Sequence, residues 1–198
     1  MTSTLRLASA DDAADVLAIY GPIVSATVIS FELEPPTEDD IRQRIDQTLT
    51  RLPWLVCEQD GQVLGYAYAA PHRTRAAYQW SVDVSAYVHE RARRFGVGRA
   101  LYTALFRILA LQGFYNAYAG IALPNPASVG LHEALGFAPV GVYRKVGYKL
   151  GDWHDVGWWQ LALQPRTDAP RPPISIAEIR QSAAWHAALA EGMPFLRV

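Results

Sequence analysis

The amino-acid sequence predicts a mixed α/β fold of the α+β kind, with one central sheet of about seven strands flanked by helices. Three observations predict this fold. Of the 198 residues 51% are apolar and only 19% are charged, so the chain can bury a sizeable core. Segments that alternate between apolar and polar residues are interspersed with segments of helical periodicity. A hairpin signal at Asp60-Gly61 in the first half excludes a doubly wound parallel sheet.

Each element has a local signal in the sequence. Ser9 and Thr37 are N-cap residues for the first two helices, and the second of these ends before Pro53. Leucine and isoleucine at helical spacing mark a third helix, and Gly136 ends a fourth. The expected strands are 4–8, 54–58, 63–70, 78–88, 115–121, 138–148 and 153–163, and the expected helices are 9–25, 37–52, 99–112 and 125–135.

The composition of the chain shifts near residue 165. Four prolines between residues 165 and 173 mark a linker, and residues 177–191 have loosely helical periodicity. We therefore expect one domain over residues 1–164, followed by a Pro-rich linker and a C-terminal helical extension over residues 165–198. The sequence leaves open whether this extension packs on a partner subunit or covers the site.

The overall composition excludes several classes of protein. Eighteen basic and nineteen acidic residues give a net charge of −1, which argues against a nucleic acid partner. The absence of a long apolar run and of a signal-peptide pattern predicts a cytoplasmic protein that does not associate with membranes. The single cysteine, Cys57, excludes an internal disulfide framework, and the five histidines lack metal-ligand spacing, so we expect no metal.

The basic residues are unusual because sixteen of the eighteen are arginines, and these are bunched. Residues 91–99, Arg-Ala-Arg-Arg-Phe-Gly-Val-Gly-Arg, lie between an expected strand and an expected helix. A helix N-terminus with glycines that permit close approach and arginines that bind anions suits a phosphate group. The alternative is an ordinary basic loop at a glycine-containing helix start. The segment matches neither standard nucleotide-binding loop.

Separated motifs in the chain resemble the GNAT superfamily of N-acetyltransferases. Arg93-x-x-Gly96-x-Gly98 matches its pyrophosphate loop, and residues 125–137 resemble its second motif, which supports the acetyl-CoA thioester. Residues 73–80, 132–136 and 147–160 resemble, more specifically, the phosphinothricin N-acetyltransferase subfamily. The resemblance covers roughly residues 4–164. It implies the GNAT fold, acetyl-CoA as co-substrate, direct attack by an amine in a ternary complex, and a homodimer.

The same resemblance implies three catalytic residues. Asp83 aligns with the glutamate base of the family but is one methylene shorter, so it acts directly or through a bridging water. His132 lies where many members carry a tyrosine that protonates the thiolate, so it is expected to serve as that acid or as a second base. Tyr87 lies on the Asp83 side of the strand and positions the amine or the thioester. The alternative for Asp83 is a polar side chain on a half-buried strand, and for His132 a structural core histidine.

The resemblance also implies two sets of binding residues. The expected cofactor-binding residues are Ala86, Tyr87, Val88, Arg93, Arg94, Phe95, Gly96, Val97, Gly98, Arg99, Asn125 and Ser128. The expected substrate-binding residues are Phe31, Arg73, Arg75 and Tyr78. Paired arginines suit the carboxylate and phosphinate groups of phosphinothricin because they bind such groups bidentately. The alternative for these arginines is a solvated basic loop.

We therefore predict an N-acetyltransferase that acts on the α-amine of a small acidic amino acid or glutamate analogue. Phosphinothricin, methionine sulfoximine and methionine sulfone are the candidate acceptors, which would make the reaction one of herbicide or antibiotic resistance. A GNAT enzyme that acts on a protein N-terminus or a polyamine is an alternative, although the Arg73 and Arg75 pair disfavours a polyamine. A non-catalytic acyl-CoA-binding protein, with Asp83 too short to work, is the other alternative.

Overall fold

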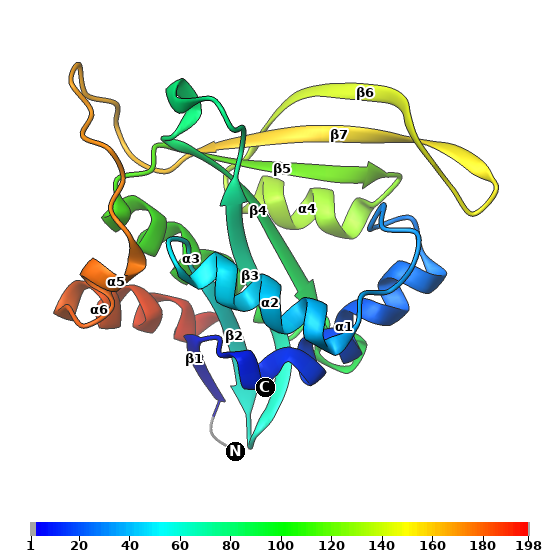
Figure 1. Ribbon diagram of the computed structural model, residues 1–198, viewed down its shortest axis with the longest axis horizontal. Coiled ribbons are helices and arrows are strands. Elements are labelled where there is room, and N and C mark those ends of the chain that lie inside the picture. Colours follow the sequence, from blue (N-terminus) through cyan, green and yellow to red (C-terminus); the bar gives the residue numbers. More distant parts are fainter. Residues whose placement is uncertain (1–2, 198) are drawn as a thin grey trace.

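The computed structural model describes residues 3–197, which form one seven-stranded sheet in the order β1-β2-β3-β4-β5-β7-β6 (Figure 1). The strands are β1 (Ser3–Leu7), β2 (Trp54–Gln59), β3 (Gln62–Pro71), β4 (Ser81–Val88), β5 (Asn116–Leu123), β6 (Ala138–Lys149) and β7 (Asp152–Ala162). β4 and β5 are parallel, and the other neighbouring strands are antiparallel. The expected mixed sheet of about seven strands is confirmed.

Helices cover both faces of this sheet (Figure 1). The helices are α1 (Ala13–Ala26), α2 (Glu38–Leu49), α3 (Val97–Gln112), α4 (Pro126–Ala134), α5 (Ile176–Ile179) and α6 (Ala183–Gly192). α1 and α2 pack on one face, where Val16 and Ile41 join Tyr66 of β3 in a buried cluster. α3 and α4 pack on the other face, where Leu101 and Leu105 lie in the larger cluster. The sheet therefore has one hydrophobic core on each of its two faces.

Three differences from the sequence-based expectation have a local structural cause. β4 begins at Ser81 and not at residue 78, because the 3-10 turn η2 (Ala76–Tyr78) precedes it. α3 begins at Val97 because Gly96, with a φ of 84°, caps the helix in the left-handed conformation. The expected helix over 177–191 is two helices, since the Ser182 side chain accepts a hydrogen bond from the Trp185 N–H and begins α6 there.

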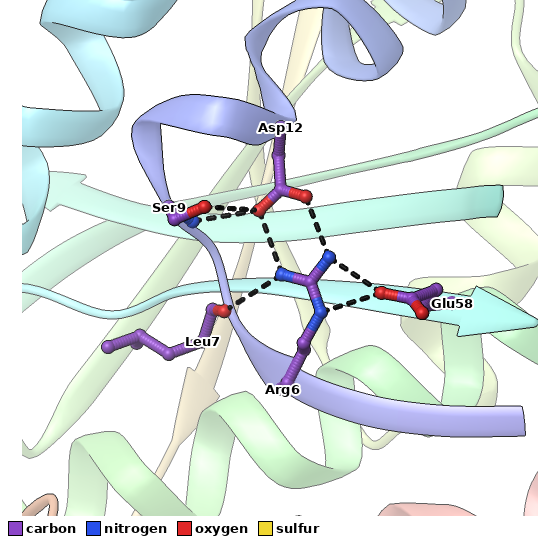
Figure 2. A network of polar contacts seen from close by, with 5 residues as sticks. All are labelled: Arg6, Leu7, Ser9, Asp12 and Glu58. Carbon is purple, nitrogen blue, oxygen red and sulfur yellow. Dashed lines mark hydrogen bonds and ion pairs between the residues drawn. The ribbon is translucent and has the colours of Figure 1, made fainter. Parts of the chain in front are cut away.

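An ion-pair network joins β1 to β2 and to the 3-10 turn η1 (Ala10–Asp12), as Figure 2 shows. Arg6 donates hydrogen bonds to the Asp12 carboxylate at 2.7 and 2.8 Å and to the Glu58 carboxylate at 2.7 Å. The Ser9 N–H donates to Asp12 at 2.8 Å. Burial raises the pKa of Asp12, but the hydrogen bonds from Arg6 and Ser9 outweigh it and hold that pKa below its usual range.

Removal of the Asp12 charge is expected to destabilise the fold. Asp12→Asn should lower the free energy of unfolding at neutral pH by about 2 to 3 kcal/mol, because Arg6 loses its buried partner. Since the pKa of Asp12 is lower in the folded state than in the unfolded state, this contribution is present above the ordinary carboxyl pKa. It is lost as the pH falls through the folded value, so the difference between variant and wild type should shrink in acid.

Urea unfolding at pH 7 and in mild acid measures this difference. Asp39→Asn is the matched control, because the Asp39 side chain forms an exposed pair with Arg42 whose removal should cost less than about 1 kcal/mol. Equal losses for the two variants would contradict a stabilising role for the Asp12 network.

The sheet opens between β4 and β5. These strands pair only between Ser81–Asp83 and Asn116–Tyr118, although β4 continues to Val88 and β5 to Leu123. In Figure 1 the first four strands run close to vertical and the last three close to horizontal. Each of the two strands therefore has an edge of unpaired backbone groups beyond Asp83 and Tyr118.

The C-terminal extension packs along α3 (Figure 1). Ile179 of α5 and Trp185 and Ala188 of α6 are buried in the same cluster as the apolar face of α3. The Gln112 amide at the end of α3 donates a hydrogen bond to the Ile174 carbonyl at 2.8 Å. The extension is thus bound to the core of the same chain.

Candidate active site

A cavity of about 760 Å³ lies beside the opening between β4 and β5. A smaller one of about 60 Å³ runs between residues 84–87 of β4 and residues 119–122 of β5, and the two share part of their lining. The predicted cofactor residues that line the larger cavity are Ala86, Tyr87, Val88, Arg93, Arg94, Gly96, Val97, Gly98, Arg99, Asn125 and Ser128. Phe95 is absent from this lining. The structure therefore brings eleven of the twelve predicted cofactor residues to one cavity.

The backbone of residues 91–99, here called the anion loop, brings the N-terminus of α3 to the cavity. Arg94 and Gly96 have φ values of 68° and 84°, so the chain turns sharply into α3. The N–H groups in the first turn of α3 have no partner within the helix, and the helix dipole adds positive potential there. A Cβ at Gly98 would lie 3.2 Å from the Leu131 side chain, so glycine lets α3 and α4 approach closely.

Asp83 lies at the point where β4 and β5 part, opposite Tyr118. Its carboxylate accepts a hydrogen bond from Nδ1 of His72 at 2.6 Å. His72 reaches Asp83 because it follows β3, in which Ala70 is paired with Asp83. The His72 ring also stacks on Tyr118 with 4.3 Å between ring centroids. The His72–Asp83 pair is therefore held by two strands at the apex of the opening.

The surroundings of Asp83 favour its action as a base. Burial raises the pKa of Asp83, and the hydrogen bond from His72 offsets only part of that rise. About a third of the side chain (32%) stays accessible to solvent. A carboxylate with a raised pKa accepts a proton more readily than an ordinary one. Because the Asp83 side chain is partly exposed, a substrate amine can reach it.

Two of the predicted substrate residues lie around this pair. The Arg73 guanidinium lies 5.8 Å from the centroid of the Trp158 ring, and it donates a hydrogen bond to the His72 carbonyl at 2.7 Å. The Tyr78 ring is edge-on to the His72 ring, with 6.1 Å between centroids. Arg75 is exposed at the start of η2. The structure thus brings Arg73 and Tyr78 to the His72–Asp83 pair and leaves Arg75 at the surface beside them.

The remaining predicted substrate residue, Phe31, packs against the β6–β7 hairpin. A Cβ at Gly147 would lie 2.1 Å from the Phe31 ring, and the His154 ring lies 6.4 Å from it. Nearby, the buried Nζ of Lys149 donates hydrogen bonds to the carbonyls of Val24 and Ser30 at 2.6 and 2.7 Å. Phe31 therefore belongs to the contact that fixes this hairpin to the segment between α1 and α2.

His132 on α4 is buried in the cavity wall and forms a pair with Tyr102 of α3. Its Nδ1 donates to the Ser128 carbonyl at 2.8 Å, which leaves Nε2 of the neutral ring to accept from the Tyr102 hydroxyl at 3.1 Å. Burial lowers the pKa of His132 and raises that of Tyr102. At neutral pH the proton between the two side chains is therefore carried by the Tyr102 hydroxyl.

Tyr87 lies on the Asp83 side of β4. Its ring is edge-on to the Tyr20 ring at 5.1 Å and tilted against the Tyr66 ring at 5.4 Å. Burial raises the pKa of Tyr87 well above its usual value, so the phenol keeps its proton. The unpaired edge of β4 at residues 84–88 presents backbone groups to the opening, where an extended ligand can pair with them.

Sequence reasoning missed four residues of this region: His72, Tyr102, Phe195 and Arg197. His72 immediately precedes the Arg73 motif, so its position beside the substrate residues was a usable signal. Tyr102 follows the helical periodicity of α3 and resembles an ordinary core residue. Phe195 and Arg197 line the larger cavity from the extension, for which the sequence carries no motif.

Three further features of the described residues bear on function: possible metal sites, possible membrane-spanning helices and the cysteine. Among residues 3–197, no cluster of three or more histidine, cysteine, aspartate or glutamate side chains has a geometry suited to a metal ion. Over the same range, no helix has both the length and the apolarity that crossing a membrane requires. Cys57 is buried in β2, and burial raises its pKa to about 11, which makes it a poor nucleophile.

The chain is similar to known acetyltransferases over most of its length. Residues 5–158 match the family described as acetyltransferase (GNAT) domain. A phosphinothricin N-acetyltransferase from Streptomyces viridochromogenes is 41% identical over 177 residues, which cover 89% of this chain and 94% of that protein. An L-methionine sulfoximine/L-methionine sulfone acetyltransferase from Pseudomonas aeruginosa is 36% identical over 173 residues, which cover 86% of this chain and 100% of that protein.

A solved structure agrees with these relatives. The crystal structure of a phosphinothricin acetyltransferase from Sinorhizobium meliloti in complex with acetyl-CoA superposes with a TM-score of 0.80 at 35% identity. The match covers 87% of this chain and 97% of that one. The expected enzyme class is confirmed, and the non-catalytic alternative is set aside. The chain belongs to the GNAT superfamily and is an acetyl-CoA-dependent N-acetyltransferase similar to the phosphinothricin acetyltransferases.

Proposed function

We propose that this enzyme acetylates the α-amine of a small acidic amino acid or glutamate analogue of the phosphinothricin, methionine sulfoximine or methionine sulfone type. The observation that carries the proposal is the His72–Asp83 pair at the apex of the β4–β5 opening, with Arg73 directly beside it. A base whose histidine partner is followed directly by an arginine suits an acceptor that carries an amine and an acidic group.

Asp83 is the base in this proposal. The α-ammonium group of the acceptor gives one proton to the Asp83 carboxylate, directly or through a water, and the free amine attacks the thioester carbonyl of acetyl-CoA. The new C–N bond forms as the C–S bond breaks, CoA leaves as a thiolate, and the thiolate takes up the second proton, which the acylated nitrogen loses. His72 is a positioning residue, because its hydrogen bond holds the Asp83 carboxylate toward the opening.

The Tyr102–His132 pair serves the departing sulfur. Both side chains line the two cavities, with His132 oriented by the Ser128 carbonyl. We assign the hydrogen bond to the developing thiolate to the Tyr102 hydroxyl, whose proton turns from His132 Nε2 to the sulfur as the C–S bond breaks, with His132 as the residue that holds this hydroxyl in place beforehand. This assignment refines the expectation from the sequence, in which His132 itself is the acid.

Arg73 and Arg75 bind the acidic groups of the acceptor. Arg73 is positioned by Trp158 and by the His72 carbonyl, and Tyr78 lies against the same histidine. Two relatives of this chain are named for phosphinothricin and for methionine sulfoximine and sulfone, which carry an α-amine and an α-carboxylate. Arginine forks bind such carboxylate and phosphinate groups bidentately.

A panel of acceptors tests the proposal. Thiol release from acetyl-CoA should be stimulated by phosphinothricin, methionine sulfoximine or methionine sulfone, with kcat/KM at least about tenfold above that for a polyamine or a peptide with a free N-terminus. Arg73→Gln should raise KM for the best acceptor while leaving that for acetyl-CoA unchanged. A preference for the polyamine or the peptide would overturn the assignment of the substrate class.

We also propose that the enzyme is a homodimer that covers the exposed face of β6. Apolar side chains on this strand and its hairpin are largely exposed, and they are Val140, Val142, Tyr143, Val146, Tyr148 and Trp153. A monomer with such a patch favours association. Sedimentation equilibrium should give twice the chain mass, and Val142→Lys should shift the mass to that of one chain. A monomeric wild type at micromolar concentration would contradict the proposal.

A further inference from the structure

The C-terminal residues return from α6 to the anion loop. α6 is fixed against the core by the buried side chain of Trp185 and by Gly192. A Cβ at Gly192 would lie 2.4 Å from the Ala100 carbonyl oxygen, so the chain passes directly against α3 at this point. The residues that follow Gly192 therefore start from a defined position beside the cofactor cavity.

The next residues dock on the anion loop through their backbone. After the 3-10 turn η4 (Met193–Phe195), the Arg197 N–H donates a hydrogen bond to the Phe95 carbonyl at 2.9 Å. A Cβ at Gly96 would lie 1.8 Å from the Phe195 carbonyl oxygen. Only glycine at position 96 permits this approach, in addition to its left-handed φ. The tail (residues 193–197) and the anion loop thus form one surface.

Side chains of the tail contribute to the cavity. Phe195 and Arg197 line it together with Arg93, Arg94 and Arg99. The Arg99 guanidinium lies over the Phe195 ring, 4.4 Å from its centroid, which is a cation–π distance. Arg197 is exposed within this lining, so its charge is available to a ligand. The cavity therefore has cations from two separate parts of the chain.

We propose that the tail is part of the acetyl-CoA site, with Arg197 binding a phosphate of the nucleotide end and Phe195 orienting Arg99 toward the same end. The proposal rests on acetyl-CoA as the co-substrate. The nucleotide end of acetyl-CoA carries a pyrophosphate and a 3′-phosphate, which exceed what the backbone N–H groups of α3 can neutralise. A charge-assisted bond from an arginine whose backbone is already hydrogen-bonded costs little ordering on binding.

The test compares acetyl-CoA with S-acetylpantetheine, which has the same thioester and lacks every phosphate. Arg197→Gln should raise KM for acetyl-CoA about tenfold and leave kcat/KM for S-acetylpantetheine unchanged. Phe195→Leu should raise KM for acetyl-CoA about threefold, since the apolar contact stays and the aromatic face is lost. Arg180→Gln is the matched control, because Arg180 is an exposed arginine of the same extension outside the cavity lining, and it should change neither value.

Calorimetric titration of CoA without an acceptor gives a second measurement that does not depend on the identity of the substrate. Arg197→Gln should weaken CoA binding about tenfold, and the difference from wild type should shrink at high salt, where phosphate contacts are screened. An unchanged affinity for CoA in a folded Arg197→Gln variant would overturn the proposal. An equal loss for acetyl-CoA and S-acetylpantetheine would also overturn it, because the effect would then not concern phosphate.

Discussion

Asp83→Asn is expected to lower kcat/KM roughly 100- to 10,000-fold and to leave the affinity for CoA near that of the wild type. The amide has nearly the shape of the carboxylate and accepts no proton at neutral pH, so the acceptor stays an ammonium ion that cannot attack. Asp83 is absent from the lining of the large cavity, which is why cofactor binding should persist. Steady-state thiol release with the best acceptor and calorimetric titration of CoA measure the two quantities.

The role of His72 is tested by the pH dependence of the same reaction. Because the base must be unprotonated, kcat/KM falls as the pH drops through the pKa of Asp83, which burial already raises. His72→Phe keeps the stacking on Tyr118 but removes the Nδ1 donor that lowers this pKa. The acid limb of the profile should therefore move to higher pH. His72→Asn, whose amide can replace the donor, should move it back toward the wild-type position.

Two results would contradict this assignment. An Asp83→Asn variant with nearly normal turnover would exclude Asp83 as the base. A His72→Phe variant with reduced activity but an unmoved acid limb would show that His72 acts on the fold and not on Asp83. Asp83→Glu is the control that keeps a carboxylate, and we expect it to retain more activity than Asp83→Asn.

Tyr102→Phe is expected to lower kcat about 100-fold with little change in KM for either substrate. The substitution removes one hydroxyl group from a fully buried ring and leaves the ring stacked on Phe106 at 5.0 Å. The hydrogen bond to the leaving sulfur matters as the C–S bond breaks, so its loss affects the transition state more than binding. Steady-state kinetics with both substrates varied, together with circular dichroism of the variant, measures this effect.

His132 variants separate two roles at the same site. In His132→Gln the side-chain oxygen can still accept a hydrogen bond from the Tyr102 hydroxyl, but the glutamine amide cannot act as an acid. If His132 orients Tyr102, this variant should keep most of the activity, whereas His132→Ala should lose it. Loss of activity in both variants together with a normal Tyr102→Phe enzyme would assign the thiolate acid to His132 instead.

Local patterns predicted most of the fold. The apolar spacing of Leu101, Leu105 and Leu109 depends only on neighbours in the sequence, and these residues are buried as expected. The Asp60-Gly61 turn likewise joins β2 to β3. Boundaries were less predictable where a competing local structure intervened. The strand expected from residue 78 begins only at Ser81, because Tyr78 belongs to the 3-10 turn Ala76–Tyr78.

Part of the candidate site could likewise be predicted from local sequence patterns, and part could not. The anion loop lies within nine consecutive residues, so its glycines and arginines could be recognised together. His72 and Asp83 meet only because β3 and β4 pair with Ala70 opposite Asp83. Tyr102 and His132 meet only because α3 and α4 pack side by side. No local pattern in the sequence predicts these two contacts, because the register of the strands and the packing of the helices depend on the whole sheet.

By itself, the sequence determined the mixed sheet, the anion loop and the kinship to the acetyltransferases, because each depends on residues close together in the chain. The tertiary structure decided which side chains face one another at the β4–β5 opening and where the extension goes. The tail reaches the anion loop because Trp185 is buried and Gly192 fits against α3, both contacts with residues far away in sequence. Long-range packing therefore assigned Phe195 and Arg197 to the cavity, where local sequence signals carry no information.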